Sequence, residues 1–223
     1  MFLTEGLNKE AENCIQTLKN NNLDKKLLVT ALDDGAYSHI HNLGVNTQLK
    51  KTNLKKEADF GTKDFFEITI NKLDIIKDAL AKYNQTVVYT DTDIVFLKDI
   101  SEDVQQFNNS DFDIMIQNDV ANFDESKKNN YCTGFIFFKP NKMCIDILKE
   151  SKQNMNERWN SRGKNDLADQ KSFNHILKKK PDLKIKCLSL KDYPNGSRYF
   201  KNLNTVYKNY TPKIVHNNYI VGT

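Results

Sequence analysis

The sequence predicts an α/β domain in which a mostly parallel central sheet is flanked by helices. Short apolar segments, typical of buried strands, alternate with longer segments in which apolar residues recur at helical spacing. The 223 residues, 39% of them hydrophobic, suit one domain with an ordinary core. Only 8 glycines and 4 prolines are present, which excludes a fibrous or disordered chain. We therefore expect residues 1–223 to form a single domain.

The first part of the chain alternates between predicted helices and strands. Apolar residues at helical spacing predict a helix over residues 4–22. Residues 26–32 form an apolar run that ends at Asp33, as expected of a buried strand that leads into a ligand-binding loop. Weaker patterns predict a short helix, a strand and a solvated basic loop at residues 36–42, 45–49 and 50–56.

The clearest helix spans residues 63–83, where apolar side chains recur about every 3.6 residues. A strand at residues 86–90 follows, and the tripeptide Asp91-Thr92-Asp93 separates it from a second apolar strand at 94–97. Both carboxylates therefore lie between two predicted strands.

The second half of the chain continues this alternation. Near its end, His216 follows a β-branched apolar pair and is expected at the end of a short strand. The other predicted elements are strands at residues 112–116, 134–138 and 183–188, helices at 143–159 and 167–177, and loops at 117–130 and around 194–197.

Charge and cysteine content exclude several classes of protein. The chain has 33 basic and 29 acidic residues, a net charge of +4, and only 3 arginines, so nucleic acid is not expected as a partner. There is no apolar run of about 18 residues and no signal-peptide pattern, so we expect no membrane span and a cytosolic protein of bacterial or viral origin. The four cysteines lie far apart, which favours buried thiols over a zinc site or disulfides.

The two carboxylates of Asp91-Thr92-Asp93 form a candidate metal site. Carboxylates two residues apart beside a sheet repel each other and lose hydration, unless a cation lies between them. Oxygen ligands at a strand end suit Mn²⁺ or Mg²⁺, which also bind substrate phosphates. His216 is a candidate third ligand. The alternatives are an exposed turn for the aspartates and a structural, hydrogen-bonded role for the histidine.

Five segments, in the same order along the chain, resemble the nucleotide-diphospho-sugar transferase family. They are residues 29–34 with Tyr37, 87–97, 132–140, Asp169-Gln170 with Phe173-Asn174, and 216–219 with Gly222. The likeness is to the GT-A glycosyltransferases grouped as family seventy-seven, and more distantly to the family-eight galactosyltransferase and glycogenin group. It implies a single GT-A, Rossmann-like domain, with a nucleotide-binding half at about residues 1–100 and an acceptor-side half at about 101–223.

The resemblance further implies a glycosyltransferase that moves a sugar from a UDP- or GDP-activated donor, UDP favoured, to a carbohydrate or glycoprotein acceptor. Asp91, Asp93 and His216 would hold Mn²⁺ or Mg²⁺ against the donor diphosphate. Asp33 can accept a hydrogen bond from uracil and the ring of Tyr37 can pack on the base. The residues implied to bind the donor are Ala31, Asp33, Tyr37, Lys72, Asp91, Thr92, Thr133, Gly134 and Asn217.

Asp169 and Gln170 match the segment that, in the family, lies beside the reacting carbon of the donor sugar. A retaining reaction, which the resemblance favours, would use one of them or a backbone carbonyl. An inverting reaction needs a carboxylate base, for which Asp119, Asp124 and Asp169 are the candidates. Cys132 departs from the family, which usually has asparagine there, and this leaves donor specificity open.

Two other functions are compatible with the sequence. Residues 91–95 also satisfy the D-x-D-x-T/V nucleophile motif of haloacid-dehalogenase-type phosphatases, although that motif normally opens the chain. A non-catalytic sugar-nucleotide-binding domain is the second alternative. Release of phosphate from small phosphoesters would favour the phosphatase, and binding without turnover would favour the non-catalytic domain.

Overall fold

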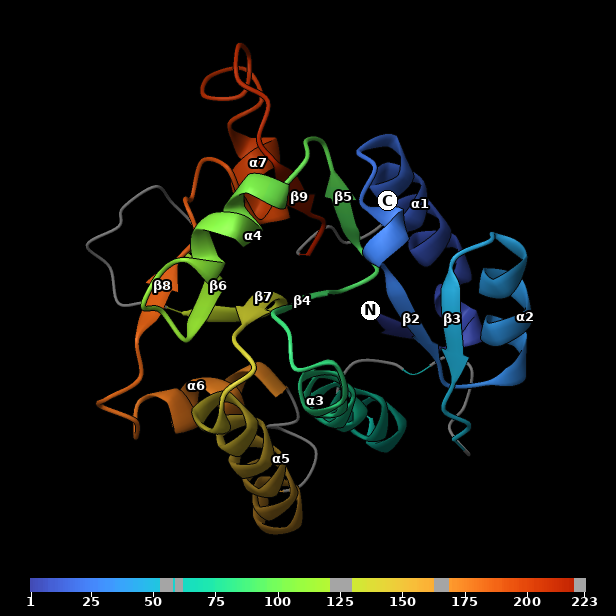
Figure 1. Ribbon diagram of the computed structural model, residues 1–223, viewed down its shortest axis with the longest axis vertical. Helices are drawn as coiled ribbons and strands as arrows, with labels where there is room; N and C mark the ends of the chain where they lie inside the picture. Colours follow the sequence, from blue (N-terminus) through green and yellow to red (C-terminus); the bar gives the residue numbers. More distant parts are fainter. Residues whose placement is uncertain (53–57, 59–61, 121–129, 163–168, 219–223) are drawn as a thin grey trace.

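The computed structural model describes residues 1–52, 58, 62–120, 130–162 and 169–218, and these parts contain both helices and strands (Figure 1). The strands are β1 (Phe2–Leu3), β2 (Leu28–Ala31), β3 (Asn46–Leu49), β4 (Val87–Thr90), β5 (Ile94–Phe96), β6 (Ile114–Asn118), β7 (Tyr131–Phe138), β8 (Ile185–Cys187) and β9 (Ile214–His216). The α-helices are α1 (Asn8–Asn20), α2 (Asp34–Asn42), α3 (Lys63–Tyr83), α4 (Ser101–Asn108), α5 (Lys142–Arg162), α6 (Asp169–Leu177) and α7 (Gly196–Lys201).

The described strands pair in both directions. The strands β1, β2 and β3 are parallel and neighbours in that order. A second sheet has the order β4-β7-β6-β8, in which β6 and β8 are parallel and β7 is antiparallel to β4 and β6. Only residues 119–130 separate β6 from β7, and antiparallel neighbours, unlike parallel ones, need no crossover helix. The predicted α/β fold with parallel strands flanked by helices is confirmed, and the second sheet also contains two antiparallel pairs.

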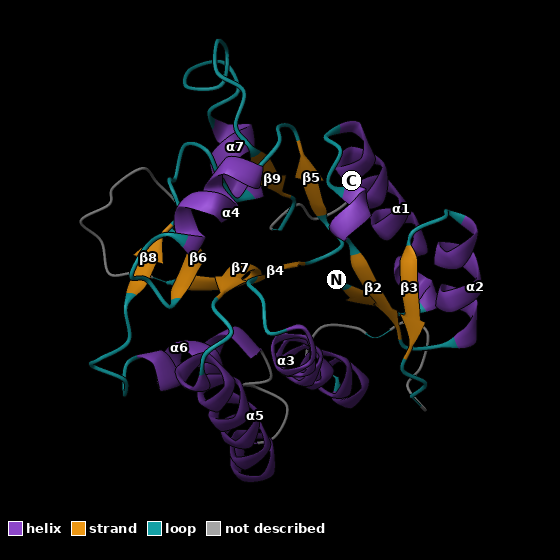
Figure 2. Cartoon of the chain, viewed as in Figure 1, coloured by secondary structure: helices purple, strands orange, loops and turns teal. Residues whose placement is uncertain are grey.

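Strand β7 faces two hydrophobic cores because its side chains alternate in direction. Phe135 and Phe137 belong to a core that includes α1 and α4, whereas Ile136 and Phe138 belong to a core that includes α3, α5 and α6. Figure 2 shows the same arrangement, with α3, α5 and α6 on one side of the β4-β7-β6-β8 sheet and α4 on the other.

Helix α3 has the bounds that its apolar period predicts. The Thr62 hydroxyl accepts a hydrogen bond from the Phe65 amide at 3.2 Å and caps the first turn. Asn84, in the left-handed conformation with φ of 48°, ends the last turn. The long helix thereby fixes the position of Lys72 next to β4.

Three elements are absent from the sequence-based prediction. Strand β1 and helix α4 were not predicted. Helix α7 begins where a loop was predicted around residues 194–197, because the Asn195 side chain accepts a hydrogen bond from the Arg198 amide at 2.8 Å and caps the helix. The predicted loops at 50–56 and 117–130 fall largely outside the described residues.

Two features of strand pairing position the site. Antiparallel pairing of β5 with β9 sets Ile94 opposite His216, so the histidine lies beside Asp93. The register of β6 and β7 shifts between the pairs Ile116–Ile136 and Asn118–Tyr131. Four residues of β7, 132–135, therefore lie opposite Gln117 alone, and the strand bulges where it passes the carboxylates.

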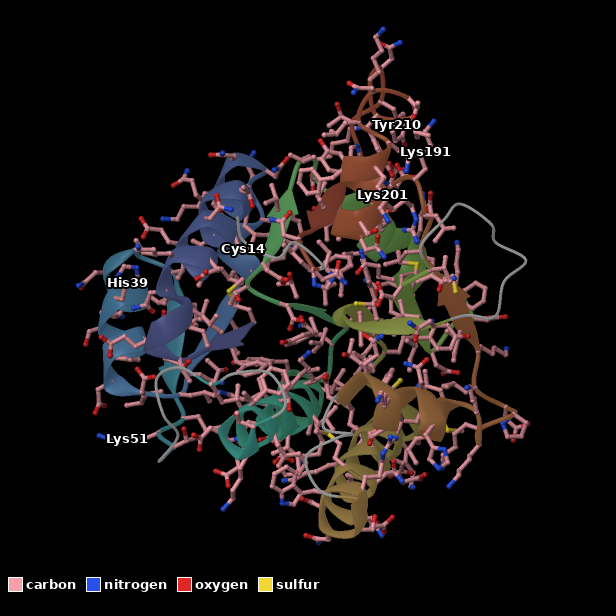
Figure 3. All side chains as sticks on the ribbon, turned by 180° about the vertical axis from the view of Figure 1, so that it is seen from behind. Cys14, His39, Lys51, Lys191, Lys201 and Tyr210 are labelled. Atoms are coloured by element: carbon pink, nitrogen blue, oxygen red, sulfur yellow. The ribbon has the colours of Figure 1, made fainter. Side chains whose placement is uncertain are left out.

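None of the described helices has the length and apolar character needed to cross a bilayer. The segment that follows α7 projects from one end of the molecule. Lys191, Lys201 and Tyr210 lie at this end in Figure 3, and Nζ of Lys191 lies 3.8 Å from the centre of the Tyr210 ring. None of these three residues lines the cavity of about 1000 Å³ that Asp91 and Asp93 line.

Candidate active site

Asp91, Asp93 and His216 meet at the ends of β4, β5 and β9. One ligand atom from each lies within 4.8 Å of the other two. Two backbone hydrogen bonds hold the turn that carries the two aspartates. The Asp91 amide donates to the Gly134 carbonyl at 2.8 Å, and the Asn217 amide donates to the Asp93 carbonyl at 2.9 Å. Asp91 and His216, which are 125 positions apart in the sequence, are thus brought together by the pairing of β5 with β9.

Gly134 makes room for this group. A Cβ atom at position 134 would lie 2.3 Å from Cε1 of His216 and 2.8 Å from Oδ2 of Asp91. Glycine therefore lets β7 pass close to both side chains. Two carboxylates and one imidazole that converge in this way fit a divalent cation such as Mn²⁺ or Mg²⁺.

The histidine and the second aspartate form a charged pair. Nε2 of His216 lies 3.2 Å from Oδ1 of Asp93. Burial alone would lower the pKa of His216, but its contacts with Cys132 and Asp93 raise that pKa well above its usual range. Burial alone would raise the pKa of Asp93, but His216 lowers it. A cation, either a proton or a metal ion, is therefore favoured between the two side chains.

Lys72 of α3 is buried between two carboxylates. Its Nζ lies 3.2 Å from Oδ1 of Asp91 and 3.0 Å from Oδ2 of Asp169, and its side chain is 6% exposed. Burial alone would lower the pKa of Lys72, but Asp169 and Asp91 raise it. The hydroxyl of Tyr89 donates to Oδ1 of Asp91 at 2.5 Å. Lys72 is therefore a buried lysine that links Asp91 to the first turn of α6.

Asp119 is the centre of a second polar cluster. Its Oδ1 accepts hydrogen bonds from Asn195 at 2.9 Å and Asn218 at 3.4 Å, and its Oδ2 accepts one from Gln170 at 3.4 Å. Asp119 is 8% exposed. Its carboxylate is therefore held in one orientation, with Oδ2 on the side of Gln170.

Both clusters line one cavity of about 1000 Å³. Phe2, Phe65 and Ile68 contribute apolar surface to it, and Thr92 and Thr133 contribute hydroxyl groups. The cavity is large enough for a ligand of several hundred daltons, and it combines apolar walls with a few converging polar groups, as small-molecule sites do.

The rim of this cavity along α6 is basic. Lys171, His175 and Lys178 line it at the spacing of one helical face. Burial, followed by the charges of Lys179 and Arg158, lowers the pKa of His175, which indicates a positive potential at the rim. Both the carboxylates of Asp91 and Asp93 and the lysines Lys171 and Lys178 therefore line the cavity.

The structure brings together most of the predicted site residues. The predicted residues that line the cavity are Lys72, Asp91, Thr92, Asp93, Asp119, Thr133, Gly134, Asp169, Gln170 and His216. Cys132 lines it too, and its Sγ lies 3.6 Å from Nδ1 of His216. Asp124 lies outside the described residues.

Four predicted donor-binding residues are not among those that line the cavity: Ala31, Asp33, Tyr37 and Asn217. Asp33 caps α2, because its Oδ1 accepts a hydrogen bond from the Ala36 amide at 2.8 Å, and its Oδ2 accepts one from the Glu5 amide at 2.9 Å. The ring of Tyr37 stacks on His41 with centres 5.5 Å apart. Their roles in donor binding stay predictions.

Three residues near the N-terminus line the cavity and were missed: Phe2, Leu7 and Glu10. Strand β1 lies next to β2, and the Leu32 amide donates to the Leu3 carbonyl at 2.9 Å. The loop that reaches the cavity is thus the one after β1, whereas the prediction placed the donor at the loop after β2. A possible signal was the apolar start of the chain followed by Thr4.

Comparisons with known proteins agree with this geometry. A family model described as nucleotide-diphospho-sugar transferase matches residues 22–223. The chain is 30% identical over 204 residues to a UDP-galactose:fucoside alpha-3-galactosyltransferase of Dictyostelium discoideum. The aligned part covers 82% of this chain and 30% of that protein. The chain thus spans less than a third of the length of this relative.

Two solved structures show the fold. The glycosyltransferase GlyE of Streptococcus pneumoniae TIGR4 superposes with a TM-score of 0.61 at 15% identity, over 96% of this chain and 51% of that chain. Mouse xyloside xylosyltransferase 1 superposes with a TM-score of 0.57 at 14% identity, over 98% of this chain and 96% of that chain. Both likenesses support the predicted GT-A fold. The match of the family model over residues 22–223 establishes that the chain belongs to the nucleotide-diphospho-sugar transferase family.

Proposed function

We propose that this protein transfers a sugar from a UDP-sugar to a carbohydrate or glycoprotein acceptor, with Mn²⁺ or Mg²⁺ held by Asp91, Asp93 and His216. The observation that most supports this function is the convergence of the three side chains, within 4.8 Å, in a cavity of about 1000 Å³. The name of the Dictyostelium relative favours UDP-galactose as the first donor to test, with GDP-sugars as the alternative.

The residues of this chain would divide the work of the reaction. Asp91, Asp93 and His216 would hold a divalent ion, which would supply positive charge to stabilise the diphosphate leaving group. Lys72 holds Asp91 in place, because its Nζ lies 3.2 Å from Oδ1 of Asp91. The basic rim of α6 attracts the anionic donor to the cavity. Thr92, Thr133 and Gly134 line the space for the donor.

Asp119 and Gln170 are the residues best placed to contact the sugars. Oδ2 of Asp119 accepts a hydrogen bond from Gln170 at 3.4 Å, so the two groups present an acceptor and an amide side by side. Asp169 faces Lys72 at 3.0 Å, which favours a role in positioning that lysine over a role as a base. Asp119 is therefore our candidate base for an inverting reaction, and Gln170 our candidate for a retaining one.

We further propose that residues 1–100 hold the nucleotide and residues 101–223 the acceptor side. Elements of both halves line the cavity. Ala31, Asp33, Tyr37 and Asn217 are retained as donor residues that act from the edge of the site. The family match argues against the haloacid-dehalogenase-type phosphatase.

The test is turnover of UDP-galactose with Mn²⁺, measured as UDP release with and without carbohydrate acceptors. We expect turnover that EDTA abolishes, and we expect Asp93→Ala to lose it. The matched control is Asp111→Ala, because the Asp111 side chain is 93% exposed. Full activity of Asp93→Ala would show the site assignment to be wrong. Metal-dependent UDP binding without turnover would favour the non-catalytic domain.

A further inference from the structure

Gln117 contacts the imidazole nitrogen of His216 that does not face Asp93. Gln117 is completely buried on β6, at the shift in register where four residues of β7 lie opposite it. Its Oε1 lies 2.8 Å from Nδ1 of His216. The polar side chain at this irregularity in strand pairing thus reaches the histidine.

The orientation of the Gln117 amide follows from its other contacts. Nε2 of Gln117 donates to the carbonyl of Tyr193 at 3.0 Å and to that of Pro194 at 3.1 Å. Carbonyl oxygens only accept hydrogen bonds, so the NH₂ group must face them and Oε1 must face the histidine. The Pro194 carbonyl also accepts from the His216 amide at 3.2 Å, which ties the same segment to the histidine backbone.

The orientation of the amide decides which nitrogen of His216 carries a proton. Oε1 can only accept, so Nδ1 carries the hydrogen that it donates to Gln117 at 2.8 Å, and the sulfur of Cys132, 3.6 Å from the same nitrogen, is the weaker partner. In the neutral ring the lone pair is then on Nε2, the nitrogen that lies 3.2 Å from Asp93. Nε2 is therefore the atom that is free to bind a cation shared with the carboxylates.

We propose that Gln117 is a positioning residue that holds His216 in the Nδ1–H form and directs Nε2 at the metal position. This inference rests on the proposed metal site. Hydrogen-bonded partners of a ligating histidine fix its tautomer and ring orientation, and their loss weakens metal binding by about 10- to 100-fold.

The test combines metal affinity with a proton signal, both measured without sugar donor. Gln117→Met keeps a similar shape but removes the acceptor. We expect its Mn²⁺ dissociation constant to rise about 10- to 100-fold. We also expect loss of a slowly exchanging imidazole N–H resonance that wild type shows and that His216→Ala identifies.

Gln48→Met is the matched control, because Gln48 is a partly buried glutamine whose Nε2 donates to the Thr30 hydroxyl at 2.8 Å, away from the site. It should bind Mn²⁺ like wild type. Wild-type affinity and an unchanged resonance in folded Gln117→Met would overturn the inference. If His216→Ala also binds like wild type, the metal site itself is wrong; if only His216→Ala loses binding, the role of Gln117 alone is wrong. If Gln117→Met does not fold, absence of a slowly exchanging His216 imidazole N–H resonance from wild type overturns the inference.

Discussion

Replacement of Gly134 with alanine perturbs the proposed metal site by a single methyl group. The new Cβ would lie 2.3 Å from Cε1 of His216, whereas real Cβ atoms essentially never come within 3.0 Å of another heavy atom. The imidazole or the backbone of β7 must therefore move by about 0.7 Å, while metal–ligand distances tolerate only about 0.2 Å. The histidine side chain is 4% exposed and bonded to Gln117, so it has little room to move.

We expect Gly134→Ala to weaken Mn²⁺ binding at least about tenfold. Overpacking of a buried site should also lower the free energy of unfolding by about 1–3 kcal/mol. Isothermal titration with Mn²⁺ and urea unfolding measure the two effects. Gly35→Ala is the control, because its Cβ would meet only the far end of the flexible Glu5 side chain. Mn²⁺ affinity in Gly134→Ala equal to that of wild type would refute the geometry of the site.

Two further predictions concern buried charges. Lys72→Met should cost about 3–5 kcal/mol of unfolding free energy, because it leaves the buried Asp169 carboxylate without its cation. In a urea double-mutant cycle, Asp169→Asn should recover part of this cost, and strictly additive costs would contradict the pairing. Burial alone would raise the pKa of Asp74, but Lys152 and Lys77 lower it below 3.8, so its stabilising effect exists above that pH and is lost as the pH falls. Asp74→Asn should therefore cost about 1 kcal/mol at neutral pH and almost nothing under strongly acidic conditions, and an equal cost at both would contradict the ion pair.

The parts of the fold that the sequence predicts well are those with long or strongly apolar patterns. The period of α3 defines residues 63–83, and the apolar run of β4 leads directly to Asp91. The β-branched pair before His216 predicts only that this residue ends a short strand, which made it a candidate ligand. The family resemblance further suggested that it joins the aspartates, and the pairing of β5 with β9 explains how it does so.

The elements that were missed have patterns too short to recognise. Strand β1 has two residues, and α4 has Phe107 as its only buried residue, so neither shows a period. Asp33 follows a strand, as a ligand-binding residue would, but in the structure it caps α2. An acidic residue between a strand and a helix can bind a ligand or cap the helix, and the sequence pattern is the same in both cases. Gln117 was assigned to a polar loop. A buried glutamine is stable in a strand only through partners distant in sequence, which no local pattern reveals.

The most direct test of the central claim is the coupling between Mn²⁺ and UDP in thermal unfolding. If Asp91, Asp93 and His216 hold a cation that the diphosphate completes, the two ligands together should stabilise the protein by more than the sum of their separate effects. A single ligand at about 100 times its dissociation constant raises the free energy of unfolding by about 2.7 kcal/mol. For a chain of this size, this raises the melting temperature by roughly 5–10 °C. We predict this coupling in wild type and its loss in Asp93→Ala. Equal stabilisation by UDP with and without Mn²⁺ would contradict the account.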